Sequence, residues 1–316
     1  MPDPFYLRAL ELAERGRGKT GHRPMVGAVV VSGGEIVGEG WYEEELVRHA
    51  EPAALEQAGE KARGATLYVT LEPCSHHGRT PPCADAVVEA GVARVVVGAR
   101  DPNPVVDGRG LTRLADAGIE VELLDDLAAR RQNEAWRVWK ALGRPFVTYK
   151  AAITLDGRVT VPGRRWVSGE ESRRRVHELR AASDAVAVGM GTVRADAPRL
   201  DARDVGATHQ PRRLAFGRGP LPSGSDLELR SGPLADELAA LAEEGVQSLL
   251  LEGGPTIATA FLEAGLVDKL LLFVAPVLSG AGQRFLGDLS HRLELLHLRS
   301  EPSGDDVLVE AYLREP

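Results

Sequence analysis

The chain has 316 residues, of which 43% are hydrophobic and 27% charged, and its formal net charge at pH 7 is −8. This length indicates two domains with separate cores and excludes a single small module. The negative charge argues against a nucleic-acid partner held mainly through phosphate contacts, so the expected partner is a small-molecule substrate. We expect a cytoplasmic location without membrane contact. No apolar run approaches the ~20 residues that span a bilayer, and the N-terminus has no basic region before an apolar one.

The first half of the chain alternates expected strands with expected helices. Apolar runs predict buried strands at residues 25–31, 66–70 and 94–98, and periodic patterns predict helices at 4–15, 49–60, 83–90 and 109–117. This alternation predicts a helix-covered sheet. A long helix is expected over residues 126–142 and a strand over 146–150, so we place the two domains at 1–144 and 145–316.

Three residues able to hold a zinc ion lie in this half, with a carboxylic acid beside one of them. They are His49, Cys74 and Cys83, and Glu51 follows His49 by two positions. An H-x-E pattern followed by P-C and a second cysteine matches the nucleobase-deaminase signature, in which one His and two Cys bind Zn²⁺ while the Glu transfers protons. Three protein ligands leave a fourth tetrahedral position for water, which indicates catalysis. The usual P-C-x-x-C is longer here, because eight residues separate the two cysteines.

The expected helices constrain how these residues meet. Residues two apart on an ideal helix diverge by about 200°, so His49 and Glu51 both face a metal only at the start of their helix. Cys83 follows Pro82, a residue type common in a first helical turn, and Gly91 marks the end of that helix. A helix N-terminus stabilises the thiolate form of cysteine.

Other interpretations of these residues stay open at this point. Either the cysteines are unrelated and the His and Glu lie on the surface, or the cysteines form a disulfide, which reducing cytosol disfavours. A structural zinc clip in an interaction module needs four protein ligands, and the sequence offers three at suitable spacing. A nucleic-acid base deaminase shares the signature, but the acidic charge, the few aromatic residues and the long cysteine spacing argue against it.

In the second half, strands are expected at residues 146–150, 185–189, 247–251, 270–275 and 306–313. The run Gly189–Thr192 is similar to the start of a dinucleotide-binding fingerprint, but Arg194 stands where its third Gly belongs, so the signal is weak. A buried strand, then Gly253-Gly254, then a helix from Pro255 to about Ala264 form a turn suited to an anion, because helix N-termini expose N–H groups. A plain strand-to-helix turn fits this segment equally well.

Read together, these motifs resemble one family, the bifunctional riboflavin-biosynthesis deaminase–reductases, over nearly the whole chain. The matching segments in the first half are residues 24–28, 49–51, 72–83 (EPCSHHGRTPPC) and 101–104. Those in the second half are residues 150–158, 191–200 and 252–256. The resemblance implies an α/β protein with an N-terminal cytidine-deaminase-like three-layer domain and a C-terminal dihydrofolate-reductase-like domain. It also implies that the long cysteine spacing is a family feature.

For the first domain, the resemblance implies hydrolytic deamination of 2,5-diamino-6-ribosylamino-4(3H)-pyrimidinone 5′-phosphate. Zinc is then held by His49, Cys74 and Cys83, and Glu51 is the catalytic proton shuttle. The residues implied in substrate binding are His76, Arg79, Asp101 and Asn103. Without the resemblance, residues 101–104 fit a simple turn punctuated by prolines.

For the second domain, the resemblance implies NADPH-dependent reduction of the ribosyl group to ribityl, with Lys150 as the catalytic donor to the ribose oxygen. The implied substrate residues are Arg180, Leu200, Arg203 and Glu252, with the arginines as phosphate clamps. The implied NADPH residues are Ala152, Trp166, Thr192, Asp196, Gly253, Gly254, Pro255 and Thr256. Read alone, Trp166 also fits a core position and Arg180 a surface helix. We expect the enzyme to form a homo-oligomer.

The chain departs from the usual family pattern at three places. Arg23 stands where the family has Asn, and Tyr42 where it has His, both in the expected substrate pocket. An Arg in place of an Asn removes an acceptor for a pyrimidine amine but adds a group that binds phosphate. The segment from Arg203 to Glu252 is short, and we expect no strand between Phe216 and Leu234. An impaired or altered reductase is therefore an open alternative.

Overall fold

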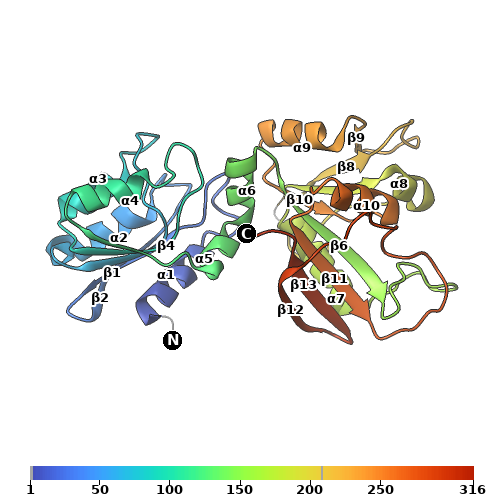
Figure 1. Ribbon diagram of the computed structural model, residues 1–316, viewed down its shortest axis with the longest axis horizontal. Helices are drawn as coiled ribbons and strands as arrows, with labels where there is room; N and C mark the ends of the chain where they lie inside the picture. The colour runs from blue at the N-terminus through green and yellow to red at the C-terminus, as the bar shows by residue number, and fades with distance from the viewer. Residues whose placement is uncertain (1–2, 208) are drawn as a thin grey trace. The chain divides into compact units, whose positions relative to one another are not determined.

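The computed structural model describes residues 3–207 and 209–316 and divides into two compact α/β units (Figure 1). The first unit ends at Leu142, and the second spans Gly143–Glu315. The functional boundary expected after residue 144 stays a prediction. None of the helices in the described part of the chain has the length and apolar content needed to cross a membrane.

A five-stranded sheet forms the centre of the first unit, in the order β2-β1-β3-β4-β5. Its strands are β1 (Gly27–Ser32), β2 (Glu35–Trp41), β3 (Thr66–Leu71), β4 (Arg94–Ala99) and β5 (Glu120–Leu123). β1 runs antiparallel to β2 and β3, whereas β3, β4 and β5 are parallel. Because β3 and β4 end at the same edge of the sheet, residues 72–74 and 100–103 come together there.

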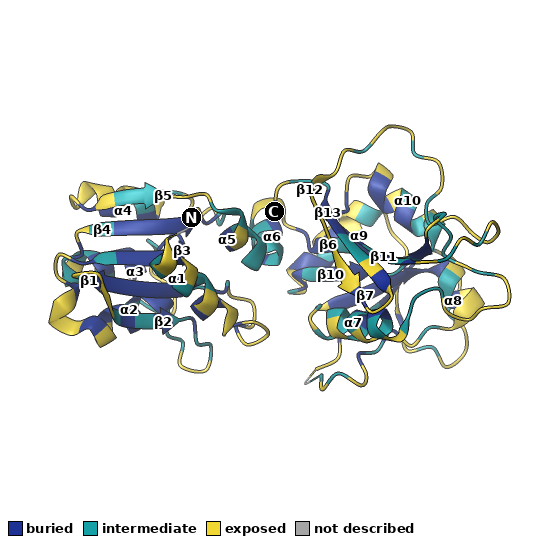
Figure 2. Cartoon of the chain, turned by 90° about the horizontal axis from the view of Figure 1, so that it is seen from below, coloured by how far each residue is buried: buried dark blue, intermediate teal, exposed yellow. Residues whose placement is uncertain are grey.

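Helices cover both faces of this sheet, which confirms the expected three-layer arrangement. They are α1 (Pro4–Glu14), α2 (Ala50–Ala58), the 3₁₀ helix η1 (Gly59–Ala62), α3 (Cys83–Ala90), α4 (Arg109–Asp116), α5 (Leu127–Gln132) and α6 (Glu134–Leu142). α1 packs on one face through Tyr6, Ala9 and Leu12, and α2, α3 and α4 pack on the other. Figure 2 shows the inner strands β1 and β4 mostly buried, as two covered faces require.

Two glycines let α2 lie directly on β2. A Cβ atom added at Gly38 would stand 2.0 Å from the carbonyl oxygen of Ala54, and one at Gly40 would stand 2.2 Å from that of Ala50. A side chain at either position would therefore force helix and strand apart. This close packing sets the position of the N-terminus of α2, where His49 is located.

The prediction of a single long helix over residues 126–142 is wrong, because the helix is interrupted at Asn133 in the structure. The Asn133 side chain is buried and pairs with the backbone of Met25, accepting from its N–H at 2.8 Å and donating to its carbonyl at 2.8 Å. Asn133 has a φ of −116°, outside the helical range. This tertiary pair overrides a continuous helical pattern, and α6 begins as a separate helix at Glu134.

The second unit is built on an eight-stranded mixed sheet, in the order β12-β13-β11-β6-β10-β7-β8-β9. Its strands are β6 (Phe146–Thr154), β7 (Ala185–Gly189), β8 (Arg212–Phe216), β9 (Glu228–Arg230), β10 (Ser248–Leu251), β11 (Lys269–Ala275), β12 (Leu296–Ser303) and β13 (Asp306–Tyr312). The strands from β6 to β11 pair in parallel, whereas β13 is antiparallel to both of its neighbours. β6, β7 and β10 therefore end at one edge, where α/β sheets bind ligands.

Helices cover both faces of this sheet as well, which confirms the helix-covered sheet expected from the sequence. They are α7 (Glu170–Ala181), α8 (Met190–Asp196), α9 (Leu234–Glu243) and α10 (Pro255–Glu263). α9 and α10 contribute Leu238 and Phe261 to one apolar cluster, and α8 contributes Met190 and Val193 to another. The two clusters take alternate residues of β7, so they lie on opposite faces of the sheet.

The expectation that no strand lies between Phe216 and Leu234 is wrong, because β9 pairs there with β8. β9 has three residues and two of them are charged, so it offers no apolar run to detect. The apolar-run criterion also misses β2, β5, β8 and β12. Of these, β2, β5 and β12 are edge strands in which charged and apolar residues are mixed, so none of them forms a continuous apolar run.

Candidate active sites

His49, Cys74 and Cys83 come together from three separate elements of the first unit. His49 is the N-cap of α2, Cys74 follows β3, and Cys83 is the first residue of α3. Their ligand atoms all lie within 4.8 Å of one another. The His49 Nδ1 atom is 3.2 Å from the Cys83 Sγ and 3.9 Å from the Cys74 Sγ. Both cysteines are free thiols, so the disulfide interpretation is wrong.

This set of atoms fits a zinc ion. One imidazole nitrogen and two sulfurs are donors that zinc prefers, and a tetrahedral site then has one position for another ligand. Within residues 3–207 and 209–316, no other His, Cys, Asp or Glu joins the group. A structural zinc clip, which requires a fourth protein ligand, is therefore not supported by the residues described.

The thiols and Glu51 affect one another's protonation. Hydrogen bonds with Cys83 and His49 lower the pKa of Cys74 to about 4, so its sulfur is a thiolate. Glu51, in the first turn of α2, is 3% exposed, and its burial beside that thiolate raises its pKa to about 7. A carboxyl group with such a pKa accepts and donates protons near neutral pH. Both His49 and Glu51 lie at the start of a helix, as their spacing requires.

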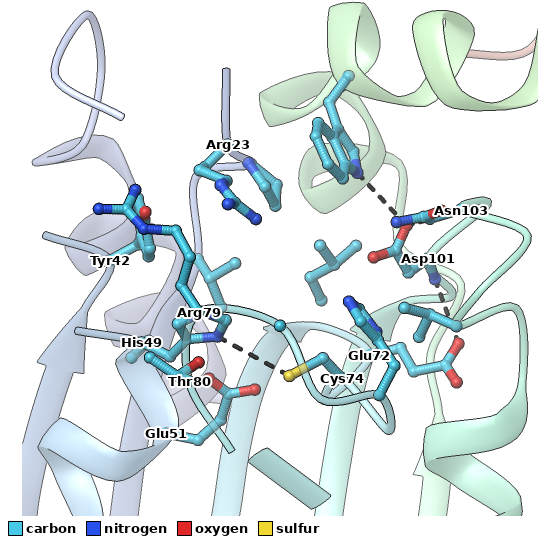
Figure 3. Close-up of a pocket in the computed structure, with 18 of the residues that line it drawn as sticks. Arg23, Tyr42, His49, Glu51, Glu72, Cys74, Arg79, Thr80, Asp101 and Asn103 are labelled. Carbon is cyan, nitrogen blue, oxygen red and sulfur yellow. Dashed lines mark hydrogen bonds between the residues drawn. The ribbon is translucent and has the colours of Figure 1, made fainter. Parts of the chain in front are cut away.

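A cavity beside this cluster collects every substrate residue expected for the first domain. His76, Arg79, Asp101 and Asn103 line it, together with His49, Glu51 and Cys74. Figure 3 shows Asp101 and Asn103 across the cavity from Tyr42 and Arg79. The buried Nδ1 atom of His76 has no hydrogen-bond partner in the described structure. A buried polar atom without a partner is a natural contact for a ligand.

The two departures from the family pattern, Arg23 and Tyr42, also line this cavity. The Tyr42 ring meets the His49 ring edge-on at a centroid distance of 5.5 Å, and the Tyr42 hydroxyl donates to Glu44. Arg79 donates to the same carboxylate at 3.1 Å. Burial and the Glu44 carboxylate raise the pKa of Tyr42 to about 12, so its hydroxyl stays protonated. Glu44 thus holds both a tyrosine and an arginine of the cavity wall.

Glu72 and Trp136 are among the residues of this cavity to which sequence reasoning assigned no role. Glu72 is buried and accepts from the backbone N–H groups of Asp101, Gly108 and Gly110 at 2.9 to 3.3 Å. It therefore fixes the chain after β4 and the start of α4 beside the metal ligands. A Glu between a buried strand and Pro-Cys is a visible signal in the sequence, whereas Trp136 lies far along the chain and carries none.

A second cavity, of about 960 Å³, opens where β6, β7 and β10 end in the second unit. The expected site residues that line it are Lys150, Ala152, Trp166, Arg180, Thr192, Asp196, Arg203, Glu252, Gly253 and Gly254. Its volume is at the upper end of the range for small-molecule sites, about 300–1,000 Å³. Trp166 is 51% exposed in this wall, so the core interpretation of that residue is wrong.

Three expected site residues do not line this cavity: Leu200, Pro255 and Thr256. The Leu200 side chain is buried against Val188 and Met190, so only its backbone is left to meet a ligand. The φ of Leu200 is 54°, in the left-handed region that is costly for a leucine and that recurs at functional sites. Pro255 and Thr256 form the first turn of α10.

Glu252 lies between two cations beside the second cavity. It accepts from Lys150 Nζ at 3.2 Å and from Arg180 Nε and Nη2 at 2.6 and 3.0 Å. Burial alone would raise the pKa of Glu252, but Lys150 and Arg180 bring it down to about 2. The ionised carboxylate holds Lys150 in the cavity wall, and an ammonium group has three donors, so further protons are available for a ligand.

The turn after β10 fits a cofactor that carries phosphate. Gly254 caps α10 without a side-chain hydrogen bond, so the first N–H groups of the helix are available to an anion. A Cβ atom at Gly253 would stand 2.0 Å from Ile257 Cγ2, so only glycine fits there. Several other residues line this cavity without any signal in the sequence, among them Arg173, His177 and Gln283.

Comparison with known proteins assigns both units. Residues 3–99 match the family described as the cytidine and deoxycytidylate deaminase zinc-binding region, and residues 145–223 and 226–309 match the RibD C-terminal domain. The riboflavin biosynthesis protein RibD of Aquifex aeolicus is 40% identical over 97% of this chain and 97% of its own length. The chain belongs to the RibD family. The RibD protein of Escherichia coli is also 40% identical, over 90% of this chain and 91% of that protein.

Solved RibD structures are similar over almost the whole chain. Acinetobacter baumannii RibD, form 1, has a TM-score of 0.85 and 36% identity, covering 98% of this chain and 97% of that one. A Thermotoga maritima diaminohydroxyphosphoribosylaminopyrimidine deaminase/5-amino-6-(5-phosphoribosylamino)uracil reductase has a TM-score of 0.82 and 34% identity, with the same coverage. As a member of the RibD family, the chain is a bifunctional enzyme of riboflavin biosynthesis, with a zinc-binding deaminase domain and an NADPH-dependent reductase domain. The fold class and the activities expected from the sequence are confirmed.

Proposed function

We propose that the first unit deaminates 2,5-diamino-6-ribosylamino-4(3H)-pyrimidinone 5′-phosphate and that the second reduces the ribosyl group of the product to ribityl. The proposal rests mainly on the cluster of His49, Cys74 and Cys83 with the buried Glu51 beside a cavity. The name of the Thermotoga maritima relative, a deaminase/reductase acting on such ribosylamino compounds, supports it.

In the first reaction, His49, Cys74 and Cys83 hold the zinc ion, which supplies Lewis acidity when bound. Glu51 takes a proton from the attacking water through its carboxylate and delivers it to the departing amine, so that ammonia leaves. The burial of Glu51 keeps bulk water from exchanging that proton.

Four side chains of the first cavity would hold the substrate during that proton transfer. Asp101 accepts from an N–H group of the pyrimidine, and His76 and Asn103 hydrogen-bond the ring edge or the ribose. Arg79 meets the phosphate as a fork of donors. The lining of one cavity by all four residues supports these roles.

In the second reaction, bound NADPH would supply the hydride, and the residues of the second cavity would orient its nicotinamide toward C1′ of the ribose. Lys150 donates a proton to the ribose oxygen, and Glu252 keeps the ammonium group in position for that. Arg180 already donates through three nitrogens to Glu252 and to the Asp201 carbonyl, so Arg203 is the better placed of the two arginines for a phosphate. The backbone of Leu200 would contact the substrate. The residues that would hold NADPH are Ala152, Trp166, Thr192, Asp196, Gly253, Gly254, Pro255 and Thr256.

The reductase domain begins before Arg144 in this proposal, slightly earlier than the sequence indicated. Arg144 is buried and binds Asp268 of the second unit through two hydrogen bonds of 2.7 Å. Asp268 in turn accepts from the backbone N–H of Val147 at 2.8 Å. Arg144 thus belongs to the fold of the reductase domain.

Two further proposals concern the whole protein. Copies associate through the reductase domain, because Leu295, Leu298 and Val307 leave an exposed apolar surface on and beside β12 and β13. Sedimentation of the protein with and without Leu298→Lys tests this, and a monomer in both cases would contradict it. The location is cytoplasmic, because free thiols that bind zinc need reducing surroundings.

The decisive experiment combines metal analysis with two assays on the diaminopyrimidinone nucleotide. We expect one zinc ion per chain, ammonia release without NADPH, and NADPH oxidation after deamination. A protein without zinc and without ammonia release would contradict the deaminase proposal. Ammonia release without NADPH oxidation would contradict the reductase proposal and indicate an altered reductase.

A further inference from the structure

The two oxygens of Asp101 have different surroundings. Oδ1 accepts from the backbone N–H of Asn103 at 2.9 Å and from the indole Nε1–H of Trp136 at 3.3 Å. Within the described residues, no protein group donates a hydrogen bond to Oδ2. This oxygen is also not enclosed by the protein as an unsatisfied polar atom. Asp101 is only 5% exposed and lines the deaminase cavity. Its second oxygen is therefore open to that cavity.

Trp136 is held firmly in the wall of the same cavity. It is 7% exposed and lies on α6, outside the residues 3–99 that match the zinc-binding deaminase region. The Lys140 ammonium group lies 4.8 Å from the centre of its ring, and the Trp139 ring lies 5.7 Å away. The side chain of Asn133, just before α6, is anchored to the backbone of Met25, next to the cavity residue Pro24. The indole thus has little freedom to turn away from Asp101.

We propose that Trp136 is a positioning residue of the deaminase, whose indole N–H orients Asp101 so that the free carboxylate oxygen accepts an N–H group of the diaminopyrimidine. The inference rests on the proposed function for the identity of the substrate. A diaminopyrimidine presents several N–H donors on its ring and exocyclic nitrogens, and an ionised carboxylate is an acceptor-only group. Without the indole donor, the carboxylate would be free to rotate or to bind water. Substrate binding would then have to order the carboxylate as well, which lowers the affinity for the substrate.

Several charged groups near Asp101 decide how its ionisation responds to the loss of the indole. Burial raises the pKa of Asp101, the hydrogen bonds from Asn103 and Trp136 lower it, Glu72 raises it and Arg137 lowers it. Lys140 of α6 also interacts with this carboxylate. Removal of the indole N–H therefore raises the pKa of Asp101. The acidic side of the pH profile of deamination moves to higher pH in consequence, because the acceptor must be ionised.

The test compares Trp136→Phe with Trp139→Phe, a matched change on the same helix that keeps an aromatic ring beside Trp136 and leaves the Asp101 hydrogen bond intact. For Trp136→Phe we expect zinc content to be retained, the KM for the nucleotide to rise about tenfold with a smaller change in kcat, and the acidic limb of kcat/KM to move upward. Trp139→Phe should show none of these changes. Equal behaviour of the two variants in an active enzyme would overturn the inference and leave the proposed function intact.

A second measurement does not depend on the folding of the Phe variant. In the wild-type enzyme, one indole ¹H–¹⁵N signal should move when the nucleotide binds and should also be the signal most affected by Asp101→Asn. No such signal would contradict the inference. In the Asp101→Asn background, Trp136→Phe should raise KM by less than twofold, because the indole acts through Asp101. If the wild-type enzyme released no ammonia from the nucleotide, the proposed function itself would fail, which is a distinct result.

Discussion

Glu51 combines burial with a position in the first turn of α2, two residues from a metal ligand. The deaminase reaction depends on this carboxyl group for proton transfer. We expect Glu51→Gln to bind zinc normally and to lose about 10²- to 10⁴-fold in kcat, since the amide cannot shuttle protons. Glu56→Gln, on the exposed side of the same helix, is the control and should deaminate at the wild-type rate. Ammonia release measured with metal content decides the point, and undiminished turnover in Glu51→Gln would rule out the shuttle.

Glu252 is the buried carboxylate of the reductase cavity, where it neutralises Lys150 and Arg180. Glu252→Gln leaves two cations without a counter-ion, so we expect the free energy of unfolding to fall by about 3–5 kcal/mol and NADPH oxidation to be lost. Glu228→Gln, which removes a partially exposed partner of Arg212, should cost less than about 1 kcal/mol. Urea denaturation of both variants checks the difference.

The ionisation of Glu252 predicts that the stability of the protein depends on pH. The pKa of Glu252 is about 2 in the folded chain against an ordinary value of 4.5, so the folded state favours the ionised form. Its contribution is complete above pH 4.5 and is lost as the pH falls from 4.5 towards 2. The unfolding free energy of the wild type should therefore decline over this range, and Glu252→Gln should show a shallower decline. Parallel curves for the two proteins would contradict the assignment.

Among the elements, α6 depends on a pair of hydrogen bonds between Asn133 and the backbone of Met25. Asn133→Ala leaves a buried N–H and a buried carbonyl without partners, so we expect the deaminase domain to lose about 2–4 kcal/mol of stability. Deamination should also decline, because Met25 follows the cavity residue Pro24. Gln132→Ala removes side-chain bonds to Leu10 and Glu14 in a less buried setting and should cost less. Thermal unfolding of the two variants, with ammonia release, measures the contrast.

The elements that end at the two sites are the ones that the sequence predicted best. β3, β4, β7 and β10 are inner strands with apolar runs, and α3 starts directly after a proline and α10 at one, a residue type typical of a first helical turn. The zinc ligands follow from their spacing, because each lies at an end of such an element. Edge strands such as β9 and the break at Asn133 depend on partners distant in the chain, and local patterns do not encode them. Trp136 was unpredictable for the same reason, since only the folded chain brings it to Asp101.

At the scale of the whole molecule, the two cavities are built from separate units with separate cores. Removal of zinc by a chelator should therefore abolish ammonia release while the reduction of an already deaminated substrate continues. Parallel assays of ammonia and NADPH on the full chain test this, and restoration of deamination by added zinc is the control. Loss of both activities on chelation would show that the reductase depends on the metal site.

The contact between α2 and the glycines of β2 fixes the position of one zinc ligand, His49. His49 caps α2, and α2 already contacts the backbone of β2 at Gly38 and Gly40. The helix therefore cannot move closer to the sheet, and a residue larger than glycine at position 38 or 40 would push it away. A substitution at either glycine should therefore move His49 relative to Cys74 and Cys83 and weaken zinc binding without touching any of the three ligands.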